Sequence, residues 1–131
     1  MKLSQASVYS VHALVFLARR KEQTPLPSHE IAEACGVPPK FLLKLLKALV
    51  PVGLLGSLKG PQGGYWLAKS PRDITLLEIV EAIDPPVWAN FPAFENGRNS
   101  ASGRLRRIYE GVAEGVRNYL QKIRLSDLAR R

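Results

Sequence analysis

Cysteine and histidine are scarce in this sequence, and their scarcity excludes several kinds of site. The chain has one cysteine, Cys35, and two histidines, His12 and His29, among 131 residues. One cysteine forms no internal disulfide, and it cannot supply an all-cysteine zinc or iron–sulfur site within one chain. A chain of this length can bury roughly two-thirds of its unfolded surface, so it needs no such support to fold. We therefore predict no metal and no other cofactor.

Long apolar runs are also missing. A membrane-spanning helix needs about 20 consecutive apolar residues, and no stretch of the chain approaches that length. The first residues, Met1 to Gln5, lack the basic, apolar and small-residue regions of a signal peptide. The apolar share of 46% and the charged share of 23% are typical of globular proteins. We expect a soluble, cytoplasmic protein.

Acidic residues are absent from the middle of the chain. Residues 34–72 contain six lysines or arginines and no aspartate or glutamate, within a total net charge of +8. The next segment, residues 73–97, is acidic, and residues 98–131 are again basic. An uncancelled positive segment is what a polyanionic partner such as DNA would favour. The alternative is a lysine-rich surface that serves only solubility.

Apolar residues recur at helical spacing in three successive segments near the N-terminus. The pattern predicts helices over residues 4–20, from Ser28 to about residue 35, and over 39–50. The first of these carries a broad apolar stripe, formed by Val8, Val11, Leu14, Val15, Leu17 and Ala18. Ser4 and Ser28 are suited to cap the first two helices, and Gly36 is suited to end the second. Pro39 stands where a first-turn proline is tolerated.

The third predicted helix has two distinct faces. Its leucines recur at helical spacing and are expected to face the core: Leu42, Leu45, Leu46 and Leu49. Its lysines, Lys40, Lys44 and Lys47, are separated by four and three residues and therefore share the opposite face. This arrangement predicts an amphipathic helix with a basic outer surface.

A glycine-rich hairpin and a further helix follow. Strand-like runs over residues 54–58 and 65–68 flank the tip Lys59-Gly60-Pro61-Gln62-Gly63-Gly64. Thr75 then caps a predicted helix through about Asp84. Helix, short helix, glycine turn, basic helix and hairpin, in this order, predict a winged helix-turn-helix, a mainly α-helical fold with a small β-hairpin.

A winged helix-turn-helix points to DNA binding. A helix of this kind fits the major groove, and a hairpin tip with little bulk can enter the minor groove. The amides at the start of the second helix, beside Ser28, offer a site for a backbone phosphate. The predicted DNA-contacting residues are Ser28, Pro39, Lys40, Leu43, Lys44, Lys47, Lys59 and Gln62.

Particular motifs make the sequence similar to a known family. These are Ile31-Ala32-Glu33 with Cys35-Gly36-Val37, the wing Lys59-Gly60-Pro61-Gln62-Gly63-Gly64-Tyr65, and the run from Ile74 to Asp84. They resemble the Rrf-type bacterial regulators, the group that includes IscR, NsrR and CymR, over residues 1–84. The resemblance implies a homodimeric, sequence-specific transcription regulator, usually a repressor, with residues 1–84 as its DNA-binding domain.

The resemblance also implies that a long terminal helix forms the dimer. Residues 103–131 would supply that helix, predicted over 103–123, and a basic tail. Its apolar stripe repeats over about six turns, and one small domain could not easily bury it alone. The predicted dimerisation residues are Leu105, Ile108, Val112, Val116, Leu120 and Ile123.

The loop over residues 85–102 departs from the family. Members that bind a cluster carry three cysteines there, and this sequence has none. We therefore expect no iron–sulfur cluster. The loop holds Trp88, Phe91 and Phe94 instead, which either pack against the terminal helix or line a pocket for a small effector.

Two other functions stay open beside the DNA-binding regulator. Cys35 could gate DNA binding as a thiol redox switch, although a small apolar residue at a turn is the simpler interpretation. The domain could also act as an interaction module that pairs with an enzyme partner. The chain has no catalytic triad in a credible context and no phosphate-binding loop of Walker type, so we predict that it is not an enzyme.

Overall fold

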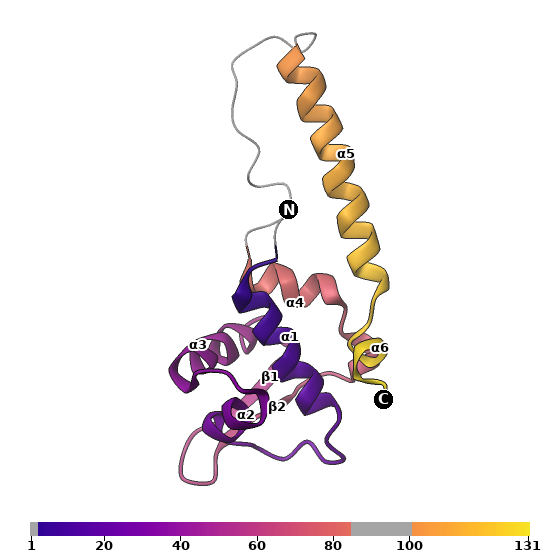
Figure 1. The fold of residues 1–131 in the computed structure, drawn as a ribbon. Coiled ribbons are helices and arrows are strands. Elements are labelled where there is room, and N and C mark those ends of the chain that lie inside the picture. The colour runs from indigo at the N-terminus through magenta and orange to yellow at the C-terminus, as the bar shows by residue number, and fades with distance from the viewer. Residues whose placement is uncertain (1–2, 85–100) are drawn as a thin grey trace.

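The computed structural model describes residues 3–84 and 101–131 (Figure 1). Its elements follow the predicted order of a winged helix-turn-helix with an added C-terminal segment. They are α1 (Gln5–Ala18), α2 (Ser28–Cys35), α3 (Pro39–Leu49), β1 (Leu55–Leu58), β2 (Gly64–Leu67), the short 3-10 helix η1 (Pro71–Asp73), α4 (Leu76–Ile83), α5 (Ala101–Lys122) and α6 (Leu125–Ala129). The predicted fold class is confirmed.

The core lies where α1, α2, α3 and α4 meet. Leu14 and Leu17 of α1 are fully buried and pack with Ile31 of α2. The predicted core leucines of α3 also belong here: Leu42, Leu46 and Leu49 are fully buried, and Leu45 is nearly so. Each fully buried leucine or isoleucine contributes about 2 kcal/mol from its removal from water, so this cluster is the main source of stability.

The inward face of α1 differs from the predicted apolar stripe. Ser7 and Ser10 are buried, whereas Val8 is 41% exposed. The Ser10 hydroxyl donates to the carbonyl of Ala6, one turn earlier, at 2.9 Å, which satisfies a buried polar group within the helix. Small serines therefore occupy inward positions, and a valine that spacing alone assigns to the core lies at the surface.

Of the residues predicted to bound α1 and α2, Ser4 and Gly36 are confirmed, and Ser28 is wrong as a cap. The Ser4 hydroxyl accepts from the Ser7 amide at 3.0 Å as the cap of α1. Gly36 ends α2 in the left-handed conformation with φ +68°. Ser28, however, is the first residue of α2 and not its cap. Pro27 holds the cap position and makes no side-chain hydrogen bond, because proline has no side-chain acceptor.

The hairpin is paired as an antiparallel ladder, with Leu55 opposite Leu67 and Leu58 opposite Gly64. Leu26 adds an isolated bridge to β2: its amide donates to the Tyr65 carbonyl at 3.1 Å, and the Tyr65 amide donates back at 2.9 Å. The linker between α1 and α2 thus behaves as a short third strand. It fixes the wing to the helical domain.

The C-terminal residues fold back onto the domain, where a basic tail was predicted. The terminal helix stops at Lys122, and α6 follows it. The Leu76 amide donates to the Ile123 carbonyl, and the Leu125 amide to the Ile74 carbonyl, each at 2.8 Å. Leu125 is fully buried in the core. These contacts make the end of the chain part of the packing of the helical domain.

The helix α5 projects far beyond this domain (Figure 1). Its C-terminal half is attached to α4 by an ion pair of 2.6 Å between Arg117 and Glu81, with both side chains partly buried. In the part of the chain that the structure describes, no helix is long and apolar enough to cross a membrane.

Candidate DNA-binding surface

The helix α3 has the two faces that the sequence predicts. Pro39 is its first residue, as predicted. Lys40, Lys44 and Lys47 are all exposed, while the leucines on the other side are buried. Leu43 is half-buried at the edge between the two faces. A rigid helix therefore presents three ammonium groups to solvent, which suits contact with phosphates or base edges.

The tip of the hairpin lies on the same side of the domain as α3 (Figure 1). Lys59 and Gln62 are both exposed there. The Gly63 amide donates to the Gly60 carbonyl at 3.0 Å and closes the tight turn, in which Gly60 has φ +109°. A side chain at Gly63 would collide with the Leu58 carbonyl. Glycine thus makes possible a narrow tip with one lysine and one glutamine.

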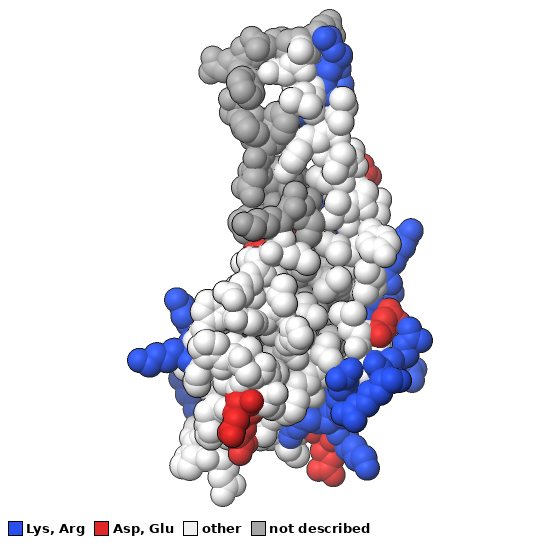
Figure 2. Space-filling view, viewed as in Figure 1, with Lys and Arg blue, Asp and Glu red and all other residues white. Residues whose placement is uncertain are grey.

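The charges of this face are distributed unevenly. Figure 2 shows lysine and arginine side chains projecting where α3 lies in Figure 1, and acidic side chains lower in the view, over α2. The exposed acids of α2 are Glu30 and Glu33. Glu30 lies in the first turn of α2, close to Ser28, where it places a carboxylate beside the helix N-terminus. That carboxylate opposes a phosphate at the same site, so Ser28 has the weakest support among the predicted contacts.

Three positioning residues were missed by the sequence-based prediction. Tyr9 of α1 packs edge-to-face on Phe41 of α3, with ring centroids 5.7 Å apart, and steadies the exposed helix. Gln23 donates to the Leu17 carbonyl at 2.7 Å and accepts from the Leu67 amide at 2.9 Å, so it joins α1 to the wing. The Tyr9–Phe41 and Gln23–Leu67 contacts join residues that are far apart in the chain, and no local pattern indicates them.

Cys35 lies at the end of α2, half-buried, with its sulfur 3.9 Å from the His12 carbonyl. Burial raises the pKa of the Cys35 thiol. A raised pKa lowers the thiolate fraction and with it the reactivity toward oxidants, which argues against the redox role. Among the described residues, no three histidine, cysteine or acidic side chains gather in a way that could hold a metal ion.

The outer half of α5 carries apolar residues that no other described part of the chain covers. Leu105, Ile108 and Val112 are 55%, 63% and 60% exposed. Val116 and Ile123 are half-buried. Leu120 is only 8% exposed and packs within its own chain, so it does not belong to the exposed stripe. The predicted stripe therefore divides between an inner part, which holds α5 on the domain, and an outer part that faces solvent.

A shallow apolar groove lies on the surface of the helical domain. It is formed by residues of the N-terminal segment, α1, α4 and α6: Leu3, Ser7, Val8, Val11, His12, Leu76, Val80 and Leu128. Leu3 and Leu128 are 48% and 38% exposed. The predicted effector-pocket residues Trp88, Phe91 and Phe94 lie outside the described residues.

Known proteins with a similar sequence or fold are transcription regulators. A family model described as "Rrf2: Iron-dependent Transcriptional regulator" matches residues 3–131. An rrf2-like HTH-type transcriptional regulator of Rhodobacter capsulatus is 31% identical, over 96% of this chain and 91% of that protein.

Among solved structures, IscR of T. potens has a TM-score of 0.75 and 29% identity, over 98% of this chain and 85% of that one. CymR of B. subtilis, described as a global cysteine regulator, has a TM-score of 0.79 over 98% and 96% of the two chains. Its 24% identity supports the fold alone. The family match covers nearly the whole chain, and we conclude that this protein belongs to the Rrf2 family of transcriptional regulators.

Proposed function

We propose that this regulator binds operator DNA as a homodimer and acts as a repressor. In each subunit α3 enters the major groove, and the tip of the β1–β2 hairpin enters the adjacent minor groove. Lys40, Lys44 and Lys47 contact phosphates or base edges, and Leu43 lies where it could contact a thymine methyl group. Lys59 and Gln62 contact the DNA from the wing.

The observation that carries this proposal is the arrangement of α3. Its leucine face is buried, so the helix cannot rotate, and its lysine face is exposed beside a narrow basic hairpin tip. No aspartate or glutamate occurs from Ala34 to Arg72. Glu78 pairs with Lys69 of this segment at 3.2 Å, but Lys69 lies outside α3 and the wing tip. A surface that only served solubility would not require a fixed helix and a fixed wing on the same side of the domain.

A second copy of the chain is the proposed cover for the exposed apolar residues of α5. Leu105, Ile108 and Val112 lie together on one face of a projecting helix. Single exposed apolar residues are common, but a contiguous group of them marks an interaction surface. In the proposed dimer, the α5 helices of two copies cross. The crossing would bury the exposed face of α5 and the apolar groove that Val8 and Val80 line.

The donor set does not fit the iron–sulfur cluster that the resemblance to cluster-binding regulators suggests. Such clusters are held mainly by cysteine thiolates, and Cys35 is the only cysteine in the chain. No group of three potential metal ligands lies among the described residues. We propose that this member regulates without a cluster. Protein purified without oxygen should show neither cluster absorbance nor stoichiometric iron and sulfide, and either signal would overturn this proposal.

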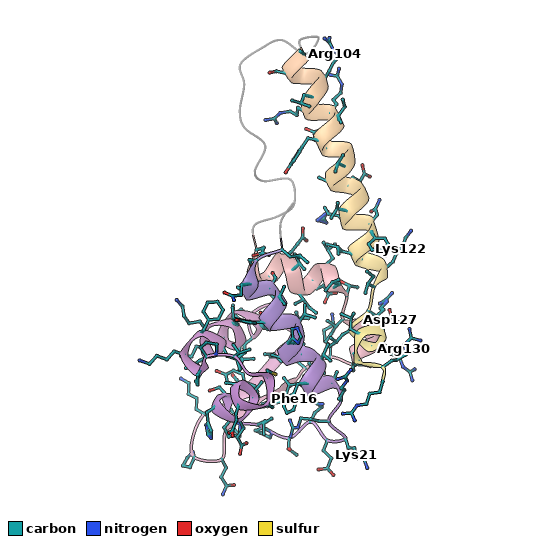
Figure 3. All side chains as sticks on the ribbon, in the orientation of Figure 1. Phe16, Lys21, Arg104, Lys122, Asp127 and Arg130 are labelled. Atoms are coloured by element: carbon teal, nitrogen blue, oxygen red, sulfur yellow. The ribbon has the colours of Figure 1, made fainter. Side chains whose placement is uncertain are left out.

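The salt dependence of DNA affinity tests the proposed binding surface. Each lysine–phosphate contact that is removed should reduce the slope of log K against log salt by about 0.9. We expect this reduction for Lys44→Ala or Lys47→Ala on α3. Lys122→Ala is the matched control, because Lys122 is exposed on α5 far from α3 (Figure 3) and should leave the slope unchanged. Equal slopes for all three variants would reject α3 as the DNA-binding helix.

The two alternative functions give different results in the same assay. A thiol switch at Cys35 predicts that peroxide changes the DNA affinity of the wild-type protein and leaves Cys35→Ser unaffected. An interaction module that pairs with an enzyme predicts weak DNA affinity with a shallow salt slope. The proposed function predicts a steep slope and no difference between wild type and Cys35→Ser under peroxide.

A further inference from the structure

A cavity opens where the end of α1, the end of α2 and the C-terminal residues meet. Its volume is about 420 Å³, within the range of small-molecule sites. It is distinct from the DNA-binding surface and from the exposed face of α5. The lining residues are His12, Val15, Phe16, Arg19, Arg20, Ala34, Cys35 and Arg131.

The cavity wall has a positively charged part and an apolar part. Three arginines line the cavity, and none of the lining side chains is acidic. The remaining wall consists of Val15, Phe16 and Ala34, with His12 and the Cys35 thiol beside them. A ligand that matched this wall would carry an anionic group for the guanidinium groups and a compact apolar part for the other side.

Two of the arginines are held in place by neutral acceptors. Arg19 donates from Nε to the Ala129 carbonyl at 3.0 Å, and from Nη2 to the Arg130 carbonyl at 3.5 Å. Arg20 donates to the carbonyl and hydroxyl of Thr24, each at 3.1 Å. These bonds orient the guanidinium groups and leave their charge intact. Orientation before binding lowers the entropic cost of binding an anion.

Arginines at the C-terminal end of α1 could also serve only to stabilise the helix dipole. It explains Arg19 and Arg20, which follow the last turn of the helix. It does not explain Arg131, which reaches the same cavity from the other end of the chain, nor the apolar side formed by Phe16 and Ala34. In Figure 3, Phe16 near the end of α1 and Arg130 after α6 lie at the same end of the domain.

From this geometry we infer that the cavity binds a small molecule with a carboxylate or phosphate group and a compact apolar body. The anionic group lies among Arg19, Arg20 and Arg131, and the apolar body lies against Val15, Phe16 and Ala34. Cys35 forms part of the wall and undergoes no reaction with this ligand. The inference goes beyond the proposed function, because binding here requires neither DNA nor a dimer.

Titration calorimetry with three probes tests the site. Phenyl phosphate and phenylacetate carry both required groups, and inorganic phosphate carries only the charge. We expect saturable binding of at least one phenyl anion, with an affinity for it about tenfold above that for inorganic phosphate. The stronger of the two phenyl anions identifies the anionic group. Absence of saturable binding of both, or equal affinity for inorganic phosphate, would overturn the inference.

Variants separate a built site from general attraction to a basic protein. Arg131→Gln and Arg20→Gln should each weaken binding about tenfold, the usual effect of losing one hydrogen bond to a charged group. Ala34→Leu should abolish binding by filling the cavity. Lys21→Gln is the matched control, because it removes one exposed charge next to Arg20 but outside the wall. Equal weakening by Lys21→Gln would show diffuse attraction and overturn the inference.

Cys35 provides a second readout, because it is the only thiol in the chain. Saturating phenyl anion should slow the reaction of Cys35 with N-ethylmaleimide in the folded protein and leave the rate in urea unchanged. An unchanged rate in the folded protein would place any bound anion elsewhere and overturn the assignment. DNA affinity is measured separately, so failure of this site and failure of the DNA-binding proposal are distinguishable.

Discussion

The carboxylate of Asp84 accepts a hydrogen bond from the Ser7 hydroxyl at 2.6 Å. The same oxygen accepts from the backbone amide of Ser4 at 3.2 Å. Asp84 ends α4, and Ser4 caps α1, so the carboxylate joins the end of one helix to the start of another. The positive end of the α1 dipole further favours a negative charge at this point.

Acid should weaken this connection. Burial alone would raise the pKa of Asp84, but the hydrogen bonds from Ser4 and Ser7 outweigh burial and hold the pKa below its ordinary value of 3.8. A lowered native pKa stabilises the fold at pH above 3.8, and that contribution disappears as the pH falls through the native value. Asp84→Asn should therefore reduce the free energy of unfolding at pH 7 by about 1 kcal/mol. Below pH 4, the free energy of unfolding of this variant should fall less steeply with decreasing pH than that of the wild type.

Urea unfolding between pH 7 and pH 2.5 measures this effect. Ser7→Ala should cost a similar amount at pH 7, because it removes the shorter of the two hydrogen bonds. Asp73→Asn, an exposed aspartate in η1, serves as the control and should change little. An unchanged pH dependence in Asp84→Asn would contradict the assigned role of the carboxylate.

The wing should depend on Gly64 more than on Gly60. A Cβ at Gly64 would collide with the backbone of Leu26, the residue that pairs with Tyr65. Gly60 has open space around it, and only its φ of +109° opposes a side chain. We expect Gly64→Ala to cost about 3 kcal/mol of unfolding free energy and Gly60→Ala about 1 kcal/mol. Thermal unfolding of the two variants compares them, and a larger cost for Gly60→Ala would contradict the account.

The outer half of α5 should control the oligomeric state. Ile108→Asp or Val112→Asp places a charge on the apolar face that we assign to the second copy, and burial of an unpaired charge is costly. Light scattering after size exclusion should show a dimer for the wild type and a monomer for either variant. The DNA affinity of these monomeric variants should be lower than that of the wild type, because a single subunit contacts only one half-site of the operator.

Asn118→Asp is the matched control for this experiment. It introduces the same charge into the same helix at an exposed polar position, and it should leave the dimer intact. If all three variants remained dimeric, the second copy would have to be placed on another surface.

The faces of α3 and the order of the elements could be predicted from the sequence, because each rests on local information. Leucines and lysines alternate along α3 with a helical period, and Gly36 alone fits the left-handed end of α2. The tip glycines similarly indicate a tight turn. In these segments local preference and the final packing agree, and the prediction needs no knowledge of distant contacts.

The face of α1 could not be predicted from spacing. The apolar residues of α1 lie on all sides of the helix, so their spacing does not show which of them are buried. Two of its buried residues, Ser7 and Ser10, are polar. Burial of α6 was missed for a related reason. Its five residues are too short for a periodic signal, and Leu125 enters the core only because residues 123–125 pair with residues 74–76. Both errors come from contacts between segments that are distant in the chain.

The proposed function requires a dimer of this chain that reads a DNA sequence with α3. Capture of fragmented genomic DNA by the purified protein, followed by sequencing, tests this claim. We predict an enriched motif with two-fold symmetry, whose enrichment is lost in Lys44→Ala and kept in Lys122→Ala. Enrichment that follows fragment length without a motif would contradict the claim, because the basic face would then bind phosphates without reading bases.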